Sequence, residues 1–341
     1  MLFRINTLVS VAQRSDNKRV GASNNINGWL MLIVPILGLI AGIWYTRIAF
    51  NHFLPPSASE HGVQTDNLFW ITMSVITAMF IITNIGLFWF AFRYRYNEER
   101  KASFFHDNTR LEVFWTIVPA VIMALLVFFG WKVWHGIMEV APSEEAIELE
   151  IMGKQFAWQV RYPGKDGVLG DYNYRLIDDA AGNEFGIDFE KKASEDDFIA
   201  REIHIPKGKE ILLKIRARDV LHSVFAPHFR LKMDAVPGMP TQFRFVPIKT
   251  TEEMRAELGN PKFNYEIACT EVCGIGHFAM RYIIVVEDEA DYKKWYAEQV
   301  PFLEQNPQFK GKGMSDLRKK NLADMKKETE GENIKTASIS K

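Results

Sequence analysis

The densest group of potential metal ligands in the sequence is the segment 269–280, CTEVCGIGHFAM. Its soft or imidazole side chains are Cys269, Cys273, His277 and Met280. A further imidazole, His222, occurs upstream in the segment DVLHSV. Two thiolates suit copper that alternates between Cu(I) and Cu(II), and imidazole with weak thioether ligation is typical of blue-copper electron-transfer sites. The residue types therefore predict a metal site and favour copper.

The same residues leave other interpretations open. Two cysteines and two histidines, His222 and His277, could form a closed Cys₂His₂ zinc site. Cys269 and Cys273 are the chain's only cysteines and could instead form a strained disulfide. His277 and Met280 could also be ordinary core residues. Spacing alone does not decide between copper and zinc.

Three apolar segments precede this region. Residues 69–92 and 113–131 contain no charged side chain. The first of these would reach roughly 36 Å as a helix, enough to cross a hydrocarbon layer of ~30 Å. A third segment, 29–46, follows a polar leader with basic residues, so it could be a signal peptide or a retained helix. We favour the retained helix and expect two or three transmembrane helices.

The loop between the two longer apolar segments indicates the topology. Residues 93–112 include five basic side chains, Arg93, Arg95, Arg100, Lys101 and Arg110. An excess of Lys and Arg in a short loop places that loop in the cytoplasm. The chain after about residue 135 is then extracytoplasmic. The net charge of −1, from 41 basic and 42 acidic residues, gives no reason to expect a nucleic-acid partner.

From about residue 144 the sequence changes to short β-forming segments separated by turns, as in AIELEIMG, EILLKIRA and RYIIVVED. This pattern predicts an all-β sandwich or barrel that extends to about residue 300. Residues 164–201 form an acidic insertion with little periodicity. Residues 305–341 are rich in Lys and Glu and are expected to be a disordered tail or a solvated helix.

Three separated motifs together resemble cytochrome c oxidase subunit II. The segment 269–280 is similar to its copper-binding loop, C-x-E-x-C-G-x-x-H-x-x-M, and DVLHSVFAPHFRLKMDAVPGMP is similar to its first-histidine segment. LEVFWTIVPA is similar to the start of its second membrane helix. The resemblance covers roughly residues 66–296. It implies a membrane helical hairpin at 66–136 and a cupredoxin-like Greek-key sandwich at 144–300. The N-terminal region 1–50, with the extra helix expected from its own apolar segment, precedes the resemblance.

The resemblance also implies a function. The chain would accept electrons from cytochrome c at a dinuclear copper A centre and pass them to haem in subunit I. Oxygen is reduced to water there, with coupled proton pumping, and the chain would not be active alone. The implied partners are subunit I, other oxidase subunits, cytochrome c and membrane lipid. The implied location is the bacterial plasma membrane, with the copper domain outside the cytoplasm.

Individual roles follow from the same resemblance. The implied copper ligands are His222, Cys269, Cys273, His277, Met280 and the backbone carbonyl of Glu271. The carboxylate of Glu271 would also reach a magnesium ion shared with subunit I. Glu112, at the cytoplasmic start of the helix 113–131, would mark the entrance of a proton path. From the residues alone, Glu271 could be an exposed loop carboxylate, and Glu112 could simply stabilise a helix N-terminus.

The sequence departs from the family pattern at one position. GKQFAW resembles the stretch G-x-Q-W-x-W, in which the first Trp receives the electron from cytochrome c, but Phe156 replaces that Trp here. Trp158 keeps the second aromatic position. Phe156 and Trp158 are therefore the candidate residues for electron entry, although Trp158 could instead be a buried core residue. We therefore expect a different entry route and a membrane-anchored or complex-bound cytochrome c as donor. The acidic insertion could steer a basic donor or could be a solvated loop.

Two rival functions remain at this point. One is a subunit of a copper A-containing nitric oxide reductase, and the other is a membrane-anchored module for copper storage or delivery. A quinol oxidase subunit would lack the copper ligands that are present here. A delivery module would hold exchangeable Cu(I) without a stable mixed-valence state.

Overall fold

The computed structural model describes residues 4–5, 8–9, 23–50, 53–139 and 141–319. The chain divides into two compact units. The membrane unit comprises residues 1–56 and 66–132, and the β unit comprises residues 57–65 and 133–341. Most of the polar leader, and the last part of the tail from residue 320, lie outside the described residues.

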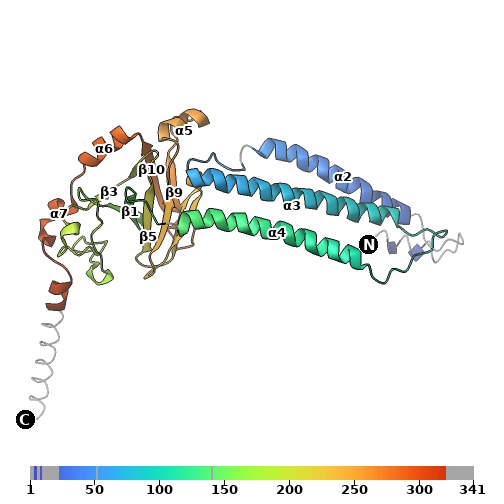
Figure 1. Cartoon of the computed structure of the whole chain (residues 1–341), viewed down its shortest axis with the longest axis horizontal. Helices are drawn as coiled ribbons and strands as arrows, with labels where there is room; N and C mark the ends of the chain where they lie inside the picture. Colours follow the sequence, from blue (N-terminus) through green and yellow to red (C-terminus); the bar gives the residue numbers. More distant parts are fainter. Residues whose placement is uncertain (1–3, 6–7, 10–22, 51–52, 140, 320–341) are drawn as a thin grey trace, which may run out of the picture. The chain divides into compact units, whose positions relative to one another are not determined.

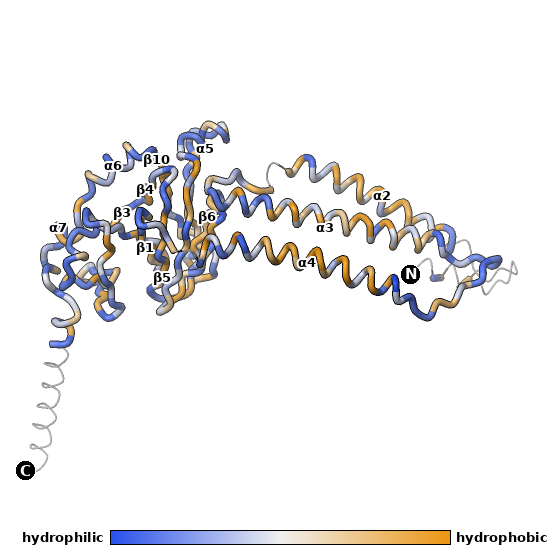
Figure 2. The backbone as a smooth tube through the Cα atoms, viewed as in Figure 1, coloured by the Kyte–Doolittle hydropathy of each residue, from blue (hydrophilic) through white to orange (hydrophobic). Residues whose placement is uncertain are grey.

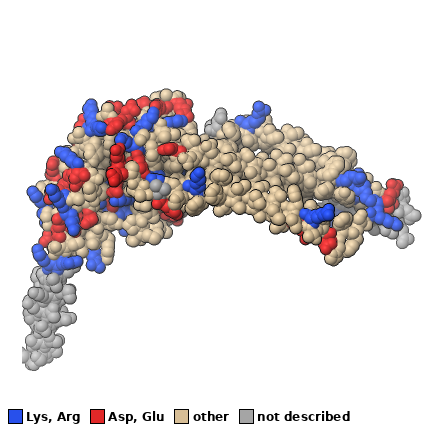
Figure 3. Space-filling view, in the orientation of Figure 1, with Lys and Arg blue, Asp and Glu red and all other residues tan. Residues whose placement is uncertain are grey.

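Three long helices form the membrane-spanning part of the chain (Figure 1). They are α2 (Ser23–Ala49), α3 (Glu60–Arg93) and α4 (Thr109–Met138). Each is long and apolar enough to cross a membrane, with mean hydropathies of 2.1, 2.0 and 2.4. Figure 2 shows their apolar character, and Figure 3 shows Lys, Arg, Asp and Glu only near the helix ends. The predicted spans are confirmed, and each helix extends beyond its span.

The helix α2 contacts α3 at both of its ends. At one end, the rings of Trp29 and Phe92 lie 4.9 Å apart. Beside them, the side chain of Asn24 donates a hydrogen bond of 3.0 Å to the carbonyl of Tyr96. Near the other end, the rings of Phe50 and Trp70 lie 5.4 Å apart. The two helices are therefore antiparallel neighbours within one unit.

The β unit is a sandwich of two five-stranded sheets, as predicted. The first sheet has the order β3-β2-β1-β5-β8, and the second has the order β4-β10-β9-β6-β7. The strands of the first sheet are β1 (Ile147–Lys154), β2 (Ala157–Tyr162), β3 (Phe198–Ala200), β5 (Ile211–Ala217) and β8 (Thr241–Phe245). Those of the second are β4 (Ile203–Pro206), β6 (His222–Ala226), β7 (Leu231–Ala235), β9 (Tyr265–Cys269) and β10 (Arg281–Glu287).

Side-chain alternation along the strands builds the core between the sheets. In β1, Leu149 and Ile151 point into the main core, whereas Glu150 and Met152 point to the opposite face. This period of two is the pattern expected for a strand. Three short helices follow or connect the strands: α5 (Thr251–Leu258), α6 (Glu289–Ala297) and α7 (Phe302–Gln305). The cupredoxin-like sandwich thus has a continuous apolar centre that fixes the strand ends.

The acidic insertion is folded rather than loosely solvated. It packs against the outer face of the first sheet through a second apolar cluster, Met152, Phe185, Ile187, Phe189, Leu303 and Phe309. The ring of Phe189 stacks on those of Phe302 and Phe309 at 5.8 and 5.5 Å. Phe309 belongs to the segment that we expected to be a tail. The start of that segment is therefore packed, in contrast to the prediction.

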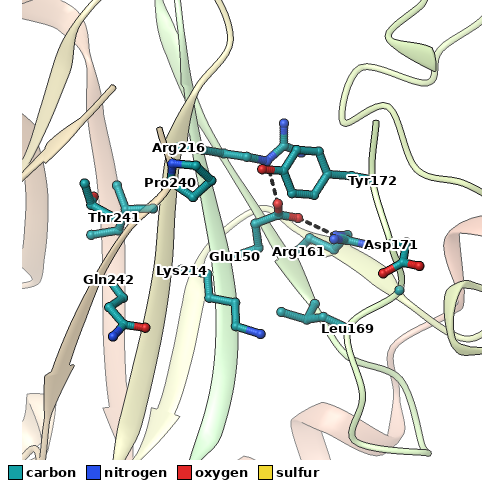
Figure 4. Close-up of a pocket in the computed structure, with 12 residues that line it drawn as sticks. Glu150, Arg161, Leu169, Asp171, Tyr172, Lys214, Arg216, Pro240, Thr241 and Gln242 are labelled. Carbon is teal, nitrogen blue, oxygen red and sulfur yellow. Dashed lines mark hydrogen bonds and ion pairs between the residues drawn. The ribbon is translucent and has the colours of Figure 1, made fainter. Parts of the chain in front are cut away.

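A buried ion network lies beneath the insertion on the same face of the sheet (Figure 4). The carboxylate of Glu150 accepts hydrogen bonds from Arg161 at 2.6 Å and from Arg216 at 2.5 Å. Arg161 also donates to Asp197 at 2.6 Å, and Arg216 stacks on the ring of Tyr172. Burial alone would raise the pKa of Glu150, but the two guanidinium groups hold it below its usual value. The network therefore compensates charges that are almost fully removed from water.

We expect Glu150→Gln to destabilise the β unit strongly, because it leaves two buried guanidinium groups without their shared carboxylate. Breaking a buried ion pair costs about 3–5 kcal/mol. The matched control is Glu148→Gln, which removes a partly exposed pair with Lys214 and should cost about 1 kcal/mol or less. Urea unfolding of the metal-free full-length chain in detergent, followed by near-ultraviolet circular dichroism, measures both. Equal losses in the two variants would contradict this account of the network.

Candidate metal centre

The predicted metal ligands come from three places in the second sheet. His222 is the first residue of β6, and Cys269 is the last residue of β9. These strands are antiparallel neighbours, with Val224 opposite Cys269. The remaining ligands lie in the loop that connects β9 to β10. The backbone N–H of Cys269 donates to the carbonyl of Met280 at 3.1 Å, which closes this loop at its base.

The structure brings all of these side chains together. The Sγ atoms of Cys269 and Cys273 lie 4.0 Å apart. His222 Nδ1 is 3.9 Å from Cys269 Sγ, and His277 Nδ1 is 3.5 Å from Cys273 Sγ. Met280 Sδ is 3.4 Å from Cys273 Sγ. The backbone carbonyl of Glu271 lies 3.3 Å from Cys269 Sγ. Each thiol therefore has one imidazole nitrogen and one weaker donor beside it.

The cluster is nearly closed to solvent. His222, Cys269, Cys273 and Met280 are buried, whereas His277 is half-buried. Burial, and then the charge of the Cys269 thiolate, raise the pKa of Cys273 to about 11. Two thiolates at this distance need a compensating cation, because unpaired buried charges are costly. The electrostatics of the cluster are those expected of a metal site.

The donor set fits two soft metal ions better than one zinc ion. Two thiol sulfurs, two imidazoles, a thioether and a carbonyl are more donors than a closed tetrahedral zinc site uses. A thioether beside thiolates and imidazoles is characteristic of copper. The separation of 4.0 Å between the two Sγ atoms is far from the ~2.05 Å of a disulfide bond, so both cysteines are free thiols in this structure.

The two aromatic candidates have different environments. Trp158 is buried, and its ring lies edge-on to the His222 ring at 5.8 Å. Phe156 is 39% exposed. Its ring covers the loop at Gly274 and Gly276, where an added Cβ would lie 3.0 and 2.4 Å from ring atoms. The glycines thus allow Phe156 to lie directly on the loop that carries the ligands.

The side chains of the two predicted carboxylates, Glu271 and Glu112, do not face the metal cluster. The carboxylate-bearing side chain of Glu271 is exposed, and only its carbonyl faces the cluster. Glu112 lies in the exposed first turn of α4, in the membrane unit. It is therefore not part of the metal centre.

Two polar residues beside the cluster were missed by the sequence interpretation. Asp219 Oδ1 lies 2.9 Å from His222 Nε2. The side chain of Gln155 donates to the carbonyl of Cys273 at 2.7 Å. Both residues lie close in sequence to predicted site residues, since Asp219 lies three residues before His222 and Gln155 immediately precedes Phe156. Their contacts depend on strand pairing, which spacing does not reveal.

Comparisons with known proteins identify the family of this chain. A family model described as "Cytochrome C oxidase subunit II, transmembrane domain" matches residues 47–133, and one described as "Cytochrome C oxidase subunit II, periplasmic domain" matches residues 147–288. Most of α2 precedes the matched residues.

Individual relatives carry related names. The chain is 34% identical over 281 residues to "Alternative cytochrome c oxidase subunit 2" of Bradyrhizobium diazoefficiens, covering 80% of this chain and 93% of the relative. It is 30% identical over 287 residues to "Cytochrome c oxidase subunit 2" of Thermostichus vulcanus, covering 75% and 83%. Among solved structures, the periplasmic domain of subunit II of a Bradyrhizobium japonicum cytochrome oxidase is 21% identical, with a TM-score of 0.31 and coverage of 46% and 95%. The chain belongs to the cytochrome c oxidase subunit II family.

Proposed function

We propose that this chain is the electron-accepting subunit of a bacterial cytochrome c oxidase. In this proposal, the cluster around Cys269 and Cys273 holds a dinuclear copper A centre. The centre takes electrons from a cytochrome c and passes them to haem in subunit I, where oxygen is reduced to water with coupled proton pumping. The observation that carries the proposal is the convergence of two thiols, two imidazoles, a thioether and a carbonyl at adjacent strand ends.

The residues of the chain would act mainly by holding and shielding the metal. Bound copper supplies one-electron chemistry, because it alternates between Cu(I) and Cu(II). Cys269 and Cys273 would hold the copper, and each has an imidazole nitrogen beside its sulfur that would complete the ligand set. Because four of the ligand side chains are buried and all of them lie on or next to paired strands, they can move little when the charge of the centre changes. Such a rigid site suits electron relay.

The rival functions make different demands on the site. A delivery module must release copper, so it would gain little from ligands enclosed at the ends of paired strands. His222, which is fully buried, has no route to solvent without local opening of the site. This argues for a resident metal and against a storage or delivery module. A nitric oxide reductase subunit would use the same copper site, and only the catalytic partner would distinguish it.

Two further roles concern the partner subunit and the membrane. We propose that Glu112 marks the entrance of a proton path into subunit I, and that the exposed carboxylate of Glu271 binds magnesium at the boundary with subunit I. The location is then the bacterial plasma membrane, with the β unit outside the cytoplasm, as the basic loop 93–112 indicates.

In the assembled oxidase, Glu112→Gln should slow proton uptake with the copper centre intact, and Glu271→Gln should lower the amount of bound magnesium. Unchanged values would reject each role.

We expect Cys269→Ser to abolish the dinuclear centre, because it removes a ligand that both ions would share. Copper affinity should fall by more than about 100-fold. Loss of a residue that only hydrogen-bonds to a metal ligand typically lowers the affinity by ~10–100-fold, and loss of the ligand itself should cost more. Electron paramagnetic resonance of the copper-loaded full-length chain should lose the signal of one electron shared by two copper nuclei. The control is Val272→Ala, in the same loop, where the side chain is 82% exposed. A shared-electron signal that survives Cys269→Ser would overturn the ligand assignment.

The replacement of Trp by Phe156 leads to a separate prediction about the donor. If the natural donor is anchored or complex-bound, a soluble cytochrome c should reduce the centre slowly. Phe156→Ala should change this rate by less than about threefold, a difference below 1 kcal/mol in the barrier. Stopped-flow reduction of the copper-loaded chain measures both quantities. Full-speed reduction by soluble cytochrome c, together with a sharp loss in Phe156→Ala, would contradict the prediction.

A further inference from the structure

The turn between β1 and β2 contacts both loops that carry the metal ligands. The backbone N–H of Gln155, in this turn, donates to Asp219 Oδ2 at 2.8 Å. The side-chain amide of the same residue donates to the carbonyl of Cys273 at 2.7 Å. Asp219 lies just before β6, and Cys273 lies between β9 and β10. One residue of the first sheet is thus bonded to both ligand loops of the second sheet.

Asp219 connects this turn to His222. Its Oδ1 atom lies 2.9 Å from His222 Nε2 and also accepts the backbone N–H of Val220 at 2.7 Å. A carboxylate at Nε2 favours the tautomer that carries its proton there and leaves Nδ1 free to bind a metal. Nδ1 is the nitrogen that faces Cys269 Sγ. The contact therefore selects both the orientation and the tautomer of the imidazole.

The end of β1 approaches the histidine closely enough to leave no space for a side chain. A Cβ added at Gly153 would lie 2.9 Å from the rings of both His222 and Trp158. The ring of His222 is therefore confined by the backbone of Gly153 on one side and held by Asp219 at Nε2. The β1–β2 turn and the imidazole form one packed unit.

We propose that Gln155 and Asp219 are positioning residues of the metal centre. Asp219 orients His222. Gln155 donates hydrogen bonds both to the Asp219 carboxylate and to the Cys273 carbonyl, and these two bonds fix the two ligand loops relative to each other. This inference rests on the proposed dinuclear copper site and adds residues that do not touch the metal. It predicts that the two residues act together, because Gln155 bonds to Asp219 as well as to Cys273.

The proposal predicts changes in copper affinity and in the midpoint potential of the centre. Loss of an outer partner of a metal ligand typically lowers metal affinity by about 10–100-fold. We expect that range for Asp219→Asn, which keeps the size of the side chain and removes its charge, and for Gln155→Met, which keeps the length and removes the amide. Asp219→Asn should also raise the midpoint potential, because the carboxylate favours the more oxidised, more positive state of the centre.

The experiment uses the full-length chain in detergent, loaded with copper. Copper affinity is measured by chelator competition, the midpoint potential by redox titration, and the site by electron paramagnetic resonance. The variants are Asp219→Asn, Gln155→Met and the double variant. The control is Gln159→Ala, which removes a glutamine of β2 that bonds to Glu184 instead of a ligand loop. Coupled residues should give a double variant whose loss is smaller than the product of the two single losses, with the control unchanged.

Three results would overturn the proposal. The first is wild-type affinity and potential in both single variants. The second is independent, multiplicative losses in the double variant. The third is a lower thermal stability of the metal-free chain with an unchanged potential, since that pattern belongs to a purely structural role. If the wild-type chain itself shows no electron shared by two copper ions, the proposed function fails and this proposal fails with it. Normal wild-type spectra with unaffected variants reject the positioning roles alone.

Discussion

The pairing of β6 with β9 is the constraint on which the metal centre depends. It places Val224 opposite Cys269, so that His222, two residues before Val224, faces the thiol across the ladder. The N–H of Thr270 continues the contact by donating to the carbonyl of Ser223 at 3.2 Å. The loop after Cys269 then returns to pair β10 with β9, and this return brings Met280 to the same point. A slip of one residue would turn His222 to the other face of the sheet.

Charge compensation away from water governs both the outer face of the first sheet and the metal centre in the second sheet. On the outer face, Glu150 is surrounded by Arg161 and Arg216, so the charges are balanced by the protein itself. At the metal centre, the buried thiols have no cationic side chain among their described contacts, and a metal ion is the natural counter-charge. The insertion, with its own apolar cluster, shields the first network. The metal centre, in contrast, is partly exposed to solvent at His277, which is half-buried.

Features that depend on local sequence could be predicted, and those that depend on packing could not. The membrane spans follow from uninterrupted apolar runs, and the metal ligands follow from rare residue types at short spacing. The contacts of Gln155 with Asp219 and with Cys273 were not predictable, because they join residues 64 and 118 positions apart. The order of the insertion was missed because its apolar residues are irregularly spaced. They pack onto Met152 and Phe309, which lie far away in the chain.

Counting copper and electrons in one sample of the full-length chain tests the central claim most directly. Copper per chain would be measured by atomic absorption, and the electrons accepted by the centre would be measured by reductive titration of its visible absorption. A dinuclear relay site predicts two copper ions that together accept one electron. One copper ion per chain, two ions that accept two electrons independently, or a colourless chain that retains zinc would contradict the account.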